Sequence, residues 1–279
     1  MNDRPLVVVK LGGSILTDDR KYQHFRKDVA DGLMMTLGSL TNKYRFLVVH
    51  GAGSFGHFPA KAYQLKDGRL RERQKVGVVR THHSMLQLTQ LLQQSAFEVG
   101  GLYPVGFPPI ALCTTGTEGG EDGRVKTFAV EPLRAAVNHG FTPFVFGDVV
   151  FDHDSKVTIL SGDQITPLVA QELGASQIIM LTDVDGVYDD NPTKNPDAQL
   201  LSELNLADEA LLKELSERAS SGKTRVTGEM EKKLLELQTV VSSGVEAWVM
   251  SGLDPSNLAG RLGKGLHVGT RLTYQKLSS

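Results

Sequence analysis

Short apolar runs rich in β-branched residues alternate along the chain with longer stretches whose apolar residues recur at helical spacing. The short runs predict strands at 6–10, 45–50, 142–151, 176–181 and 245–250. The longer stretches predict helices at 28–40, 81–99, 128–139, 163–173, 207–218 and 229–242. Several strands are apolar throughout, which is typical of strands covered on both faces. The alternation therefore predicts an α/β fold with a mainly parallel sheet and helices on both sides.

Three stretches interrupt this alternation. Residues 115–125 are polar and glycine-rich, which predicts a hairpin or a mobile loop. Residues 189–199 contain two prolines and predict a surface loop, whereas 217–230 are small and polar and lead into a helix. No internal repeat and no flexible interdomain linker is evident. We therefore expect two lobes, 1–160 and 161–279, that share one continuous sheet across a soft boundary.

Composition narrows the class of protein. The 279 residues are 40% hydrophobic and 22% charged, which is enough for a sizeable core and argues against disorder. The net charge is −2 with both signs mixed, so there is no electrostatic case for a nucleic acid or an anionic membrane as partner. An anionic substrate would have to be caught by local groups.

Cysteine content and apolar run lengths address metal sites and cellular location. Cys113 is the only cysteine, so it predicts a small buried side chain, with no internal disulfide and no thiolate cluster for a metal. The N-terminal apolar run is too short for a signal peptide, and no segment reaches the roughly 18 apolar residues of a membrane span. We expect a cytoplasmic enzyme without a protein metal site.

Candidate chemistry begins in the turn after the first strand, KLGGS, residues 10–14. Its two glycines allow close approach of the backbone, and Ser14 offers a helix cap or a hydroxyl for an anion. Lys10 stands at the strand's end, where ligands bind in open α/β sheets. A tight turn with an exposed lysine is the alternative. The lysine precedes the glycines, so the turn is not a P-loop.

The second turn, within VVHGAGSFGHF (48–58), has two interpretations. Gly51, Gly53 and Gly56 match the dinucleotide fingerprint of oxidoreductases, which requires an acidic residue at the end of a strand about 20 residues later. Glu72 stands at that distance, but in a charged run with no strand before it. Alternatively, the glycines bring backbone N–H groups around a reacting phosphate. His57 has a role only in this second interpretation.

Two more polar turns follow predicted strands. In LSGDQI (160–165), Gly162 allows a tight turn, and Asp163 either caps the following helix or holds nearby lysines. In LTDVDGVYDDNP (181–192), Thr182, Asp183 and Asp185 suit ribose hydroxyls or a metal-bound phosphate, although turn chemistry alone explains an Asp-Gly pair.

Taken together, the four turns predict a crevice for two phosphate-bearing groups. Lys10 and Lys233 are available to neutralise charge. Phosphoryl transfer requires positioning and charge neutralisation from the protein rather than covalent chemistry. These residue types therefore favour a phosphotransferase.

The motifs KLGGS, SGDQ and TDVDGVYDDNP resemble, in order, the signatures of the amino-acid kinase superfamily, from residue 6 to the closing GTRL at 269–272. HGAGSFGH, FGDVV (146–150) and LSGDQI resemble its isopentenyl phosphate kinase branch, to which fosfomycin kinases are close. The resemblance implies ATP- and Mg²⁺-dependent phosphorylation of isopentenyl phosphate to isopentenyl diphosphate in an alternative mevalonate route. It also implies a homodimer and a three-layer αβα sandwich, with the acceptor in the N-terminal lobe and the nucleotide in the C-terminal lobe.

The resemblance also assigns roles to residues. The catalytic set would be Lys10, His57, Asp163 and Lys233. The acceptor's phosphate would meet Ala52, Gly53, Gly56, His57 and Gly162. Ala52, Gly53 and Gly56 would offer their backbone N–H groups. ATP would meet Lys10, Gly12, Gly13, Ser14, Gly53, Thr182, Asp183, Gly186, Tyr188, Gly228, Met230 and Lys233.

Two positions depart from the family pattern. Asp19 stands where the family usually has a lysine, so Arg20 or Lys21 would have to replace that charge. Glu229 stands where the family has a glycine near the phosphates, and in the first turn of a helix it would favourably point to solvent. Either change would alter rate or acceptor choice.

Other residues have less specific interpretations. An apolar pocket for the acceptor's tail is expected along 76–92, with Val79, His83 and Leu86 as candidates. His82 and His83 lack metal spacing, Trp248 suits packing, and 69–75 suits a solvated helix face or the rim of the acceptor site. The alternatives to the kinase prediction are a fosfomycin or other alkyl-phosphate kinase, a non-catalytic nucleotide-binding regulator, and the dinucleotide oxidoreductase.

Overall fold

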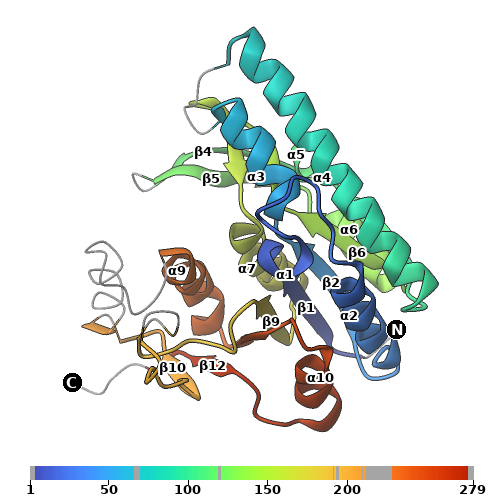
Figure 1. Ribbon diagram of the computed structural model, residues 1–279, viewed down its shortest axis with the longest axis vertical. Helices are drawn as coiled ribbons and strands as arrows, with labels where there is room; N and C mark the ends of the chain where they lie inside the picture. The colour runs from blue at the N-terminus through green and yellow to red at the C-terminus, as the bar shows by residue number, and fades with distance from the viewer. Residues whose placement is uncertain are drawn as a thin grey trace.

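A large, mainly parallel sheet forms the centre of the molecule (Figure 1). The structure is a computed structural model that describes residues 4–65, 70–118, 121–190, 192, 195–208, 210–211 and 228–275. The eight strands follow the order β10-β12-β11-β9-β1-β2-β6-β3, and of these pairs β11–β12 runs antiparallel. The strands are β1 (Leu6–Leu11), β2 (Arg45–His50), β3 (Pro104–Phe107), β6 (Thr142–Phe146), β9 (Gln177–Thr182), β10 (Glu203–Asn205), β11 (Glu246–Ser251) and β12 (Thr270–Thr273).

Helices cover both faces of this sheet, which confirms the predicted αβα sandwich. They are α1 (Gly13–Leu16), α2 (Lys27–Ser39), α3 (Gly53–Ala62), α4 (Glu72–Glu98), α5 (Pro109–Leu112), α6 (Glu131–Asn138), α7 (Gly162–Leu173), α9 (Gly228–Ser242), α10 (Pro255–Leu258) and the π-turn η2 (Ala259–Gly263). Within the described ranges, no helix is long and apolar enough to cross a membrane.

Most predicted helices in the described residues agree with these bounds, and one, α4, differs clearly at its start. Helix α4 begins at residue 72 instead of 81, and in its polar first turn the Gln74 side chain accepts the Arg71 N–H at 3.2 Å. Polar residues give no apolar spacing, so periodicity missed this turn. Helix α3 was not predicted, since its glycines suggested a loop. The predicted helix at 207–218 falls largely outside the described residues.

A second sheet, in the order β5-β4-β7-β8, was not predicted. Its strands are β4 (Cys113–Glu118), β5 (Glu121–Phe128), β7 (Asp148–Asp152) and β8 (Lys156–Leu160). Within the glycine-rich stretch, residues 115–118 and 121–125 thus belong to the paired strands β4 and β5, as the hairpin interpretation required. The single strand predicted at 142–151 is wrong, because Gly147 separates β6 from β7. The apolar run is continuous across Gly147, which concealed the change of sheet.

Strand β1 shows how the sheet directs side chains into two cores. Leu6 and Val8 belong to the core on the α7 and α9 side, whereas Val7, Val9 and Leu11 belong to the core shared with α2 and α4. Side chains alternate along a strand, so Lys10 points to the same side as Leu6 and Val8. The α7 N-terminus lies on that side, at the carboxyl end of the strand.

Candidate active site

Four strands that end at the site, β1, β2, β6 and β11, are each followed by a glycine whose N–H bonds to a neighbouring strand. These bonds, 2.8–3.0 Å long, run from Gly12 to Leu181, Gly51 to Leu11, Gly147 to His50 and Gly252 to Thr182. They align the carboxyl ends of the strands along one edge of the sheet, where α/β folds bind ligands. The Gly12 N–H is used within the sheet. Gly12 would therefore serve a phosphoryl group by its lack of a side chain, which lets the group approach the backbone.

The first and second glycine turns cross at backbone contact. A Cβ atom at Gly13 would lie 2.3 Å from the Gly53 nitrogen, and Gly53 has φ of +46°. The buried Thr17 hydroxyl joins the two turns by accepting the Ser54 N–H at 2.9 Å and donating to the Gly13 carbonyl at 3.0 Å. Ser14 lies half-buried in the same short helix, α1. The two glycine turns therefore lie together, as the sequence predicted. The sequence did not predict that Thr17 would link them.

Helix α3 begins at Gly53, and this changes the expected role of Gly56. Its N–H donates to the Ala52 carbonyl at 3.2 Å inside the helix. A Cβ at Gly56 would lie 2.9 Å from the Met85 sulfur of α4. Gly56 thus allows α3 and α4 to pack closely, rather than offering an N–H to a phosphate. His57, one turn beyond Gly53, is exposed.

Asp163, at the N-terminus of α7, forms ion pairs with two lysines. Its carboxylate lies 2.6 Å from Lys10 Nζ and 3.6 Å from Lys233 Nζ. Lys10 is only 4% exposed. Burial raises the pKa of Asp163, but the charges of Lys10 and Lys233 outweigh it and hold the pKa below its ordinary value. The carboxylate is therefore charged and fixes both ammonium groups.

The cap of α7 is Ser161 rather than Asp163. The Ser161 hydroxyl oxygen accepts the Asp163 N–H at 3.0 Å, and Gln164 completes a capping box by accepting the Ser161 N–H at 3.1 Å. Of the two interpretations of Asp163, this arrangement favours the one in which it holds lysines. Gly162 lets the helix start approach the sheet, since a Cβ there would lie 3.1 Å from the His50 carbonyl oxygen.

His50, the last residue of β2, is fully buried directly before the second glycine turn. Its Nδ1 lies 3.1 Å from the Gly51 carbonyl oxygen and its Nε2 lies 2.9 Å from the Thr89 hydroxyl. Burial lowers its pKa to about 4, so the ring is neutral near pH 7. The Thr89 hydroxyl donates its proton to the Met85 carbonyl oxygen at 2.8 Å, so it faces Nε2 as an acceptor. The sequence analysis missed this residue, although VVHG places it beside the turn.

The fourth turn extends the site from the end of β9. Thr182 is buried and donates to Asp183 at 3.1 Å, and the Tyr188 hydroxyl donates to Asp185 at 3.1 Å. Gly186 is packed so closely that a Cβ would lie 2.6 Å from the Thr270 hydroxyl. The turn is thus held against β12, and Asp183 and Asp185 remain exposed.

Helix α9 supplies Lys233 and starts at Gly228. Met230, expected to line the nucleotide pocket, is 7% exposed and packs in the apolar core with Leu234 and Leu237. It is therefore a core residue of the described structure. The side chain of Glu229 lies outside the described part of the chain.

The segment around Asp19, which departs from the family pattern, contains an ion pair between Asp18 and Arg20. Arg20 donates to both carboxylate oxygens of Asp18, at 2.9 and 3.1 Å, while its side chain is 86% exposed. The hydrogen bonds from Arg20 hold the pKa of Asp18 well below its usual range. Asp19 accepts from Thr17 at 3.2 Å. Arg20 is thus committed at the surface, and Lys21 stays the candidate for the missing cation.

The side chains that were candidates for a tail pocket on α4 lie on its exposed face. Val79, His83 and Leu86 are exposed, Val79 by 66%. The buried stripe of α4 contains Thr81 and Met85 instead. Both sets have helical spacing, so periodicity alone did not identify the inward face.

His82 forms a contact that the sequence analysis did not predict. Its Nδ1 lies 2.6 Å from the fully buried carboxylate of Asp148, in the FGDVV motif. Burial raises the pKa of Asp148, and the hydrogen bond to Asp148 raises the pKa of His82. The pair joins α4 to the first residue of β7.

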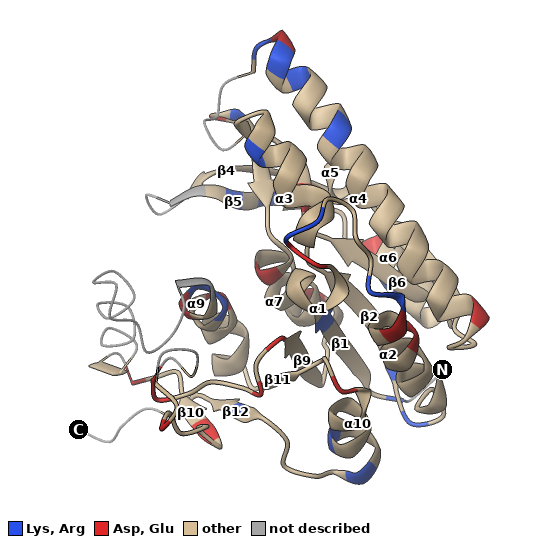
Figure 2. Ribbon diagram, viewed as in Figure 1, with Lys and Arg blue, Asp and Glu red and all other residues tan. Residues whose placement is uncertain are grey.

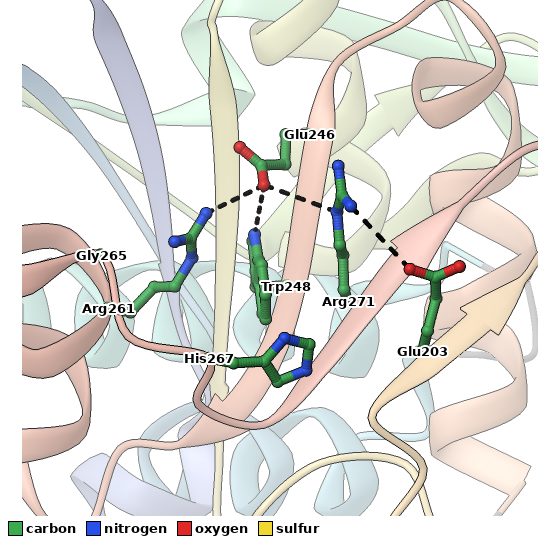
Figure 3. Close-up of a pocket in the computed structure, with 7 residues that line it drawn as sticks. All are labelled: Glu203, Glu246, Trp248, Arg261, Gly265, His267 and Arg271. Carbon is green, nitrogen blue, oxygen red and sulfur yellow. Dashed lines mark hydrogen bonds and ion pairs between the residues drawn. The ribbon is translucent and has the colours of Figure 1, made fainter.

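A pocket of about 350 Å³ lies at the opposite end of β11 (Figure 3). Glu246 accepts from Trp248 at 3.0 Å and Arg261 at 2.9 Å, and lies 3.6 Å from Arg271. Arg261 lies 4.0 Å above the Trp248 ring. These charges pair with one another, so the cluster joins β11, β12 and η2. Trp248 is buried, as predicted for a packing residue.

Charge elsewhere is dispersed. Figure 2 shows acidic and basic positions interspersed over the fold, with basic positions gathered on the first turns of α4. Within the described residues there is no group of three or more His, Cys, Asp or Glu side chains that could hold a metal ion. Cys113 is buried as predicted, and burial raises its pKa to about 12.

Comparisons with known proteins identify the family. The sequence profile of the amino acid kinase family matches residues 5–251. An isopentenyl phosphate kinase of Methanothermobacter thermautotrophicus is 30% identical over 276 residues, which cover 96% of this chain and 99% of the relative. One from Thermoplasma acidophilum is 29% identical over 95% of this chain and 99% of its own. An X-ray structure of an isopentenyl phosphate kinase superposes with a TM-score of 0.80, at 28% identity, over 96% of this chain and 100% of that one.

Proposed function

The chain belongs to the amino acid kinase family, and from this premise we propose that it is an isopentenyl phosphate kinase. In this reaction a phosphate oxygen of isopentenyl phosphate attacks the γ-phosphorus of ATP. The bond from that phosphorus to the β–γ bridging oxygen breaks, and isopentenyl diphosphate and ADP are released.

The observation that carries this proposal is the pair of lysines on one half-buried carboxylate. Asp163 holds Lys10 and Lys233 where the glycine turns meet at the carboxyl edge of the sheet. Negative charge shifts between phosphate oxygens during transfer, and preorganised cations stabilise that charge without reorganising. Lys10 would meet the transferring phosphoryl group and Lys233 the phosphates of ATP.

His57 is the proposed acceptor contact. It stands exposed on α3, one turn from the crossing of Gly13 and Gly53. A charged imidazole adds a charge-assisted hydrogen bond to a phosphate, which contributes about 1.5–3 kcal/mol. Ala52 and Gly53 would bring backbone close to the same phosphate.

The proposed division of labour follows the sheet. Strands β1, β2, β6 and β3 come from residues 1–160 and are neighbours, and β9, β11, β12 and β10 come from 161–279 and are neighbours. The two sets meet at β1 and β9. We assign the acceptor to the first lobe and the nucleotide to the second, with Thr182, Asp183, Gly186, Tyr188 and Gly228 on the nucleotide side.

Mg²⁺ belongs to the proposal as a companion of ATP. Mg²⁺ is commonly held by substrate phosphates and one or two carboxylates, with waters completing its shell. The described residues, which offer no cluster of three metal-binding side chains, suit an ion that enters on the nucleotide. Bound there, Mg²⁺ would neutralise phosphate charge, while Lys10, Asp163 and Lys233 keep the positions described above.

A homodimer is also proposed, through the edge of the sheet at β3. Four large apolar side chains are exposed on or beside this strand and at the end of α4, namely Phe97, Val99, Tyr103 and Phe141. Exposed strand edges and apolar patches favour association. Light scattering after chromatography should give a dimer for the wild type and a monomer for Tyr103→Asp. We further propose a cytoplasmic location, where ATP is available.

The decisive experiment is an acceptor panel with ATP and Mg²⁺. ATP consumption should occur with isopentenyl phosphate and exceed that with fosfomycin, other alkyl phosphates or amino acids. Preference for fosfomycin or another alkyl phosphate would indicate the related kinase instead. ATP binding without turnover on any acceptor would indicate a nucleotide-binding regulator, and preference for a nicotinamide dinucleotide over ATP would indicate the oxidoreductase.

His57 variants test the acceptor assignment. His57→Ala should raise KM for the acceptor and lower kcat, because the charge-assisted hydrogen bond is lost, while ATP binding stays nearly unchanged. His57→Gln keeps a donor and should retain more activity. Steady-state kinetics with each substrate varied in turn provide the measurement. Weakened ATP binding with unchanged acceptor KM would reverse the assignment of the two lobes.

A further inference from the structure

One ion pair joins the β4–β5 hairpin to the helix that carries Lys233. Arg124 Nη1 of β5 lies 2.8 Å from each carboxylate oxygen of Glu236 on α9. The two residues are 112 positions apart in the chain. The side chains are 36% and 19% exposed, respectively, so the contact is partly shielded from water.

Glu236 and Lys233 share one face of α9. Residues three apart on a helix are neighbours on its surface. Lys233 uses this face to approach the Asp163 carboxylate at 3.6 Å. Arg124 therefore binds α9 one turn from the lysine that would face the ATP phosphates, and on the same side.

The hairpin belongs to the other half of the molecule. Strand β4 pairs with β7, and the Thr115 hydroxyl donates to Asp152 at 2.7 Å. Strand β7 starts directly after Gly147, whose N–H bonds to His50 at the edge of the site. By contrast, α9 packs through Leu234 and Leu237 in the core that also contains Ile165 and Val169 of α7. The ion pair thus connects a hairpin built on residues 1–160 to a helix built on residues 161–279.

We propose that Arg124 is a positioning residue that sets the place of Lys233 by holding Glu236. The role rests on the proposed kinase function, in which Lys233 neutralises the ATP phosphates. In this role Arg124 acts through α9. Removing it would let the first turns of α9 move away from Asp163 and reduce the charge that Lys233 places at the site.

Kinetics of single variants give the first test. Arg124→Gln should lower kcat about tenfold, within the range of coupling between contacting residues, and should leave acceptor KM nearly unchanged. Arg124→Lys, which keeps the charge, should retain more activity. The exchanged pair Arg124→Glu with Glu236→Arg should recover most of the loss. Glu131→Gln is the matched control, because it breaks the exposed Arg134–Glu131 pair within α6 and should leave kcat unchanged.

A double-mutant cycle with Lys233→Ala separates positioning from general stability. If Arg124 acts through Lys233, Arg124→Gln should have no further effect once Lys233 is removed. The cycle is measured on kcat and, independently, on the Kd of a non-hydrolysable ATP analogue. The same loss in both backgrounds would overturn the proposal, as would unchanged kcat and analogue Kd in Arg124→Gln.

The analogue Kd also separates this inference from the proposed function. The binding cycle uses no acceptor, so it stays informative if isopentenyl phosphate proves not to be the substrate. If no acceptor is phosphorylated but the double-mutant cycle on analogue Kd shows coupling between Arg124 and Lys233, the kinase assignment alone would be refuted. Additive binding effects in an active enzyme would refute the positioning role alone.

Discussion

The ion pair of Arg20 favours one of two hypotheses that the sequence left open. The family usually has a lysine where Asp19 stands, and both Arg20 and Lys21 were candidates to replace it. Arg20 is bound to Asp18 at the surface, and exposed pairs of this kind contribute little to stability. Arg20→Ala should therefore keep near-normal kcat, whereas Lys21→Ala should lower it.

Asp19→Lys completes this test, since it restores the family's cation and should rescue Lys21→Ala. The three variants are compared by kcat and ATP KM at saturating acceptor. A large loss in Arg20→Ala, with Lys21→Ala unaffected, would show that the Asp18–Arg20 pair opens during the reaction.

His50 makes stability depend on pH. Its pKa is about 4 in the folded protein, against an ordinary 6.5. Between these values the unfolded chain takes up a proton and the folded protein does not, so stability falls as pH decreases from 6.5 towards 4. The difference corresponds to about 3 kcal/mol.

Denaturant titrations at several pH values provide the measurement for His50. The free energy of unfolding of the wild type should fall more steeply between pH 6.5 and 4 than that of His50→Gln, which has no proton to gain. Equal slopes in the two proteins would contradict the buried, neutral histidine.

At the level of elements, glycines determine how closely the turns approach one another. Gly53→Ala would place a Cβ 2.2 Å from the Thr17 hydroxyl, at a residue with φ of +46°. Both the clash and the backbone strain oppose the native crossing. We expect loss of at least 100-fold in kcat, the scale seen when a preorganised donor is displaced. Gly101→Ala is the control, because it has positive φ but no atoms within 4 Å, and its kcat should stay close to wild type.

One ion pair joins α4 to β7. Replacing His82 by leucine leaves the buried Asp148 carboxylate uncompensated, and breaking a buried pair in this way costs about 3–5 kcal/mol. The second change, Asp148→Asn, should recover part of the loss because the buried charge is removed. Thermal unfolding of the two variants measures both effects. An unchanged Tm in His82→Leu would show that Asp148 is satisfied elsewhere.

The elements that sequence predicted well are those in which one physical rule dominates. Strands β1, β2, β9 and β11 are apolar and buried, so periodicity located them within one or two residues. Helix α3 was missed because packing against Met85, and not helix propensity, explains Gly56. The break between β6 and β7 was missed because both strands are apolar.

For the whole molecule, the order of the motifs predicted which charged residues meet at the site. It did not predict ion pairs between residues far apart in the chain and outside the motifs. Lys10, Asp163 and Lys233 come from three distant segments, and the predicted ends of strands and starts of helices brought them together. Ion pairs such as His82–Asp148 and Arg124–Glu236 join residues 66 and 112 positions apart. Neither ion pair can be recognised in the sequence, because any polar side chain at those four positions would give the same pattern of polar and apolar residues.

Strand β1 has one further consequence, which concerns synthesis on the ribosome. One edge of β1 pairs with β2, which follows soon after it, and the other pairs with β9, roughly 170 residues later. At about 5–20 residues per second, that interval takes about 10–30 s. Throughout it, the open edge of β1 presents unpaired N–H and C=O groups beside apolar side chains. Nascent chains that end before residue 177 should therefore bind chaperones or aggregate, and release from both should coincide with the emergence of β9.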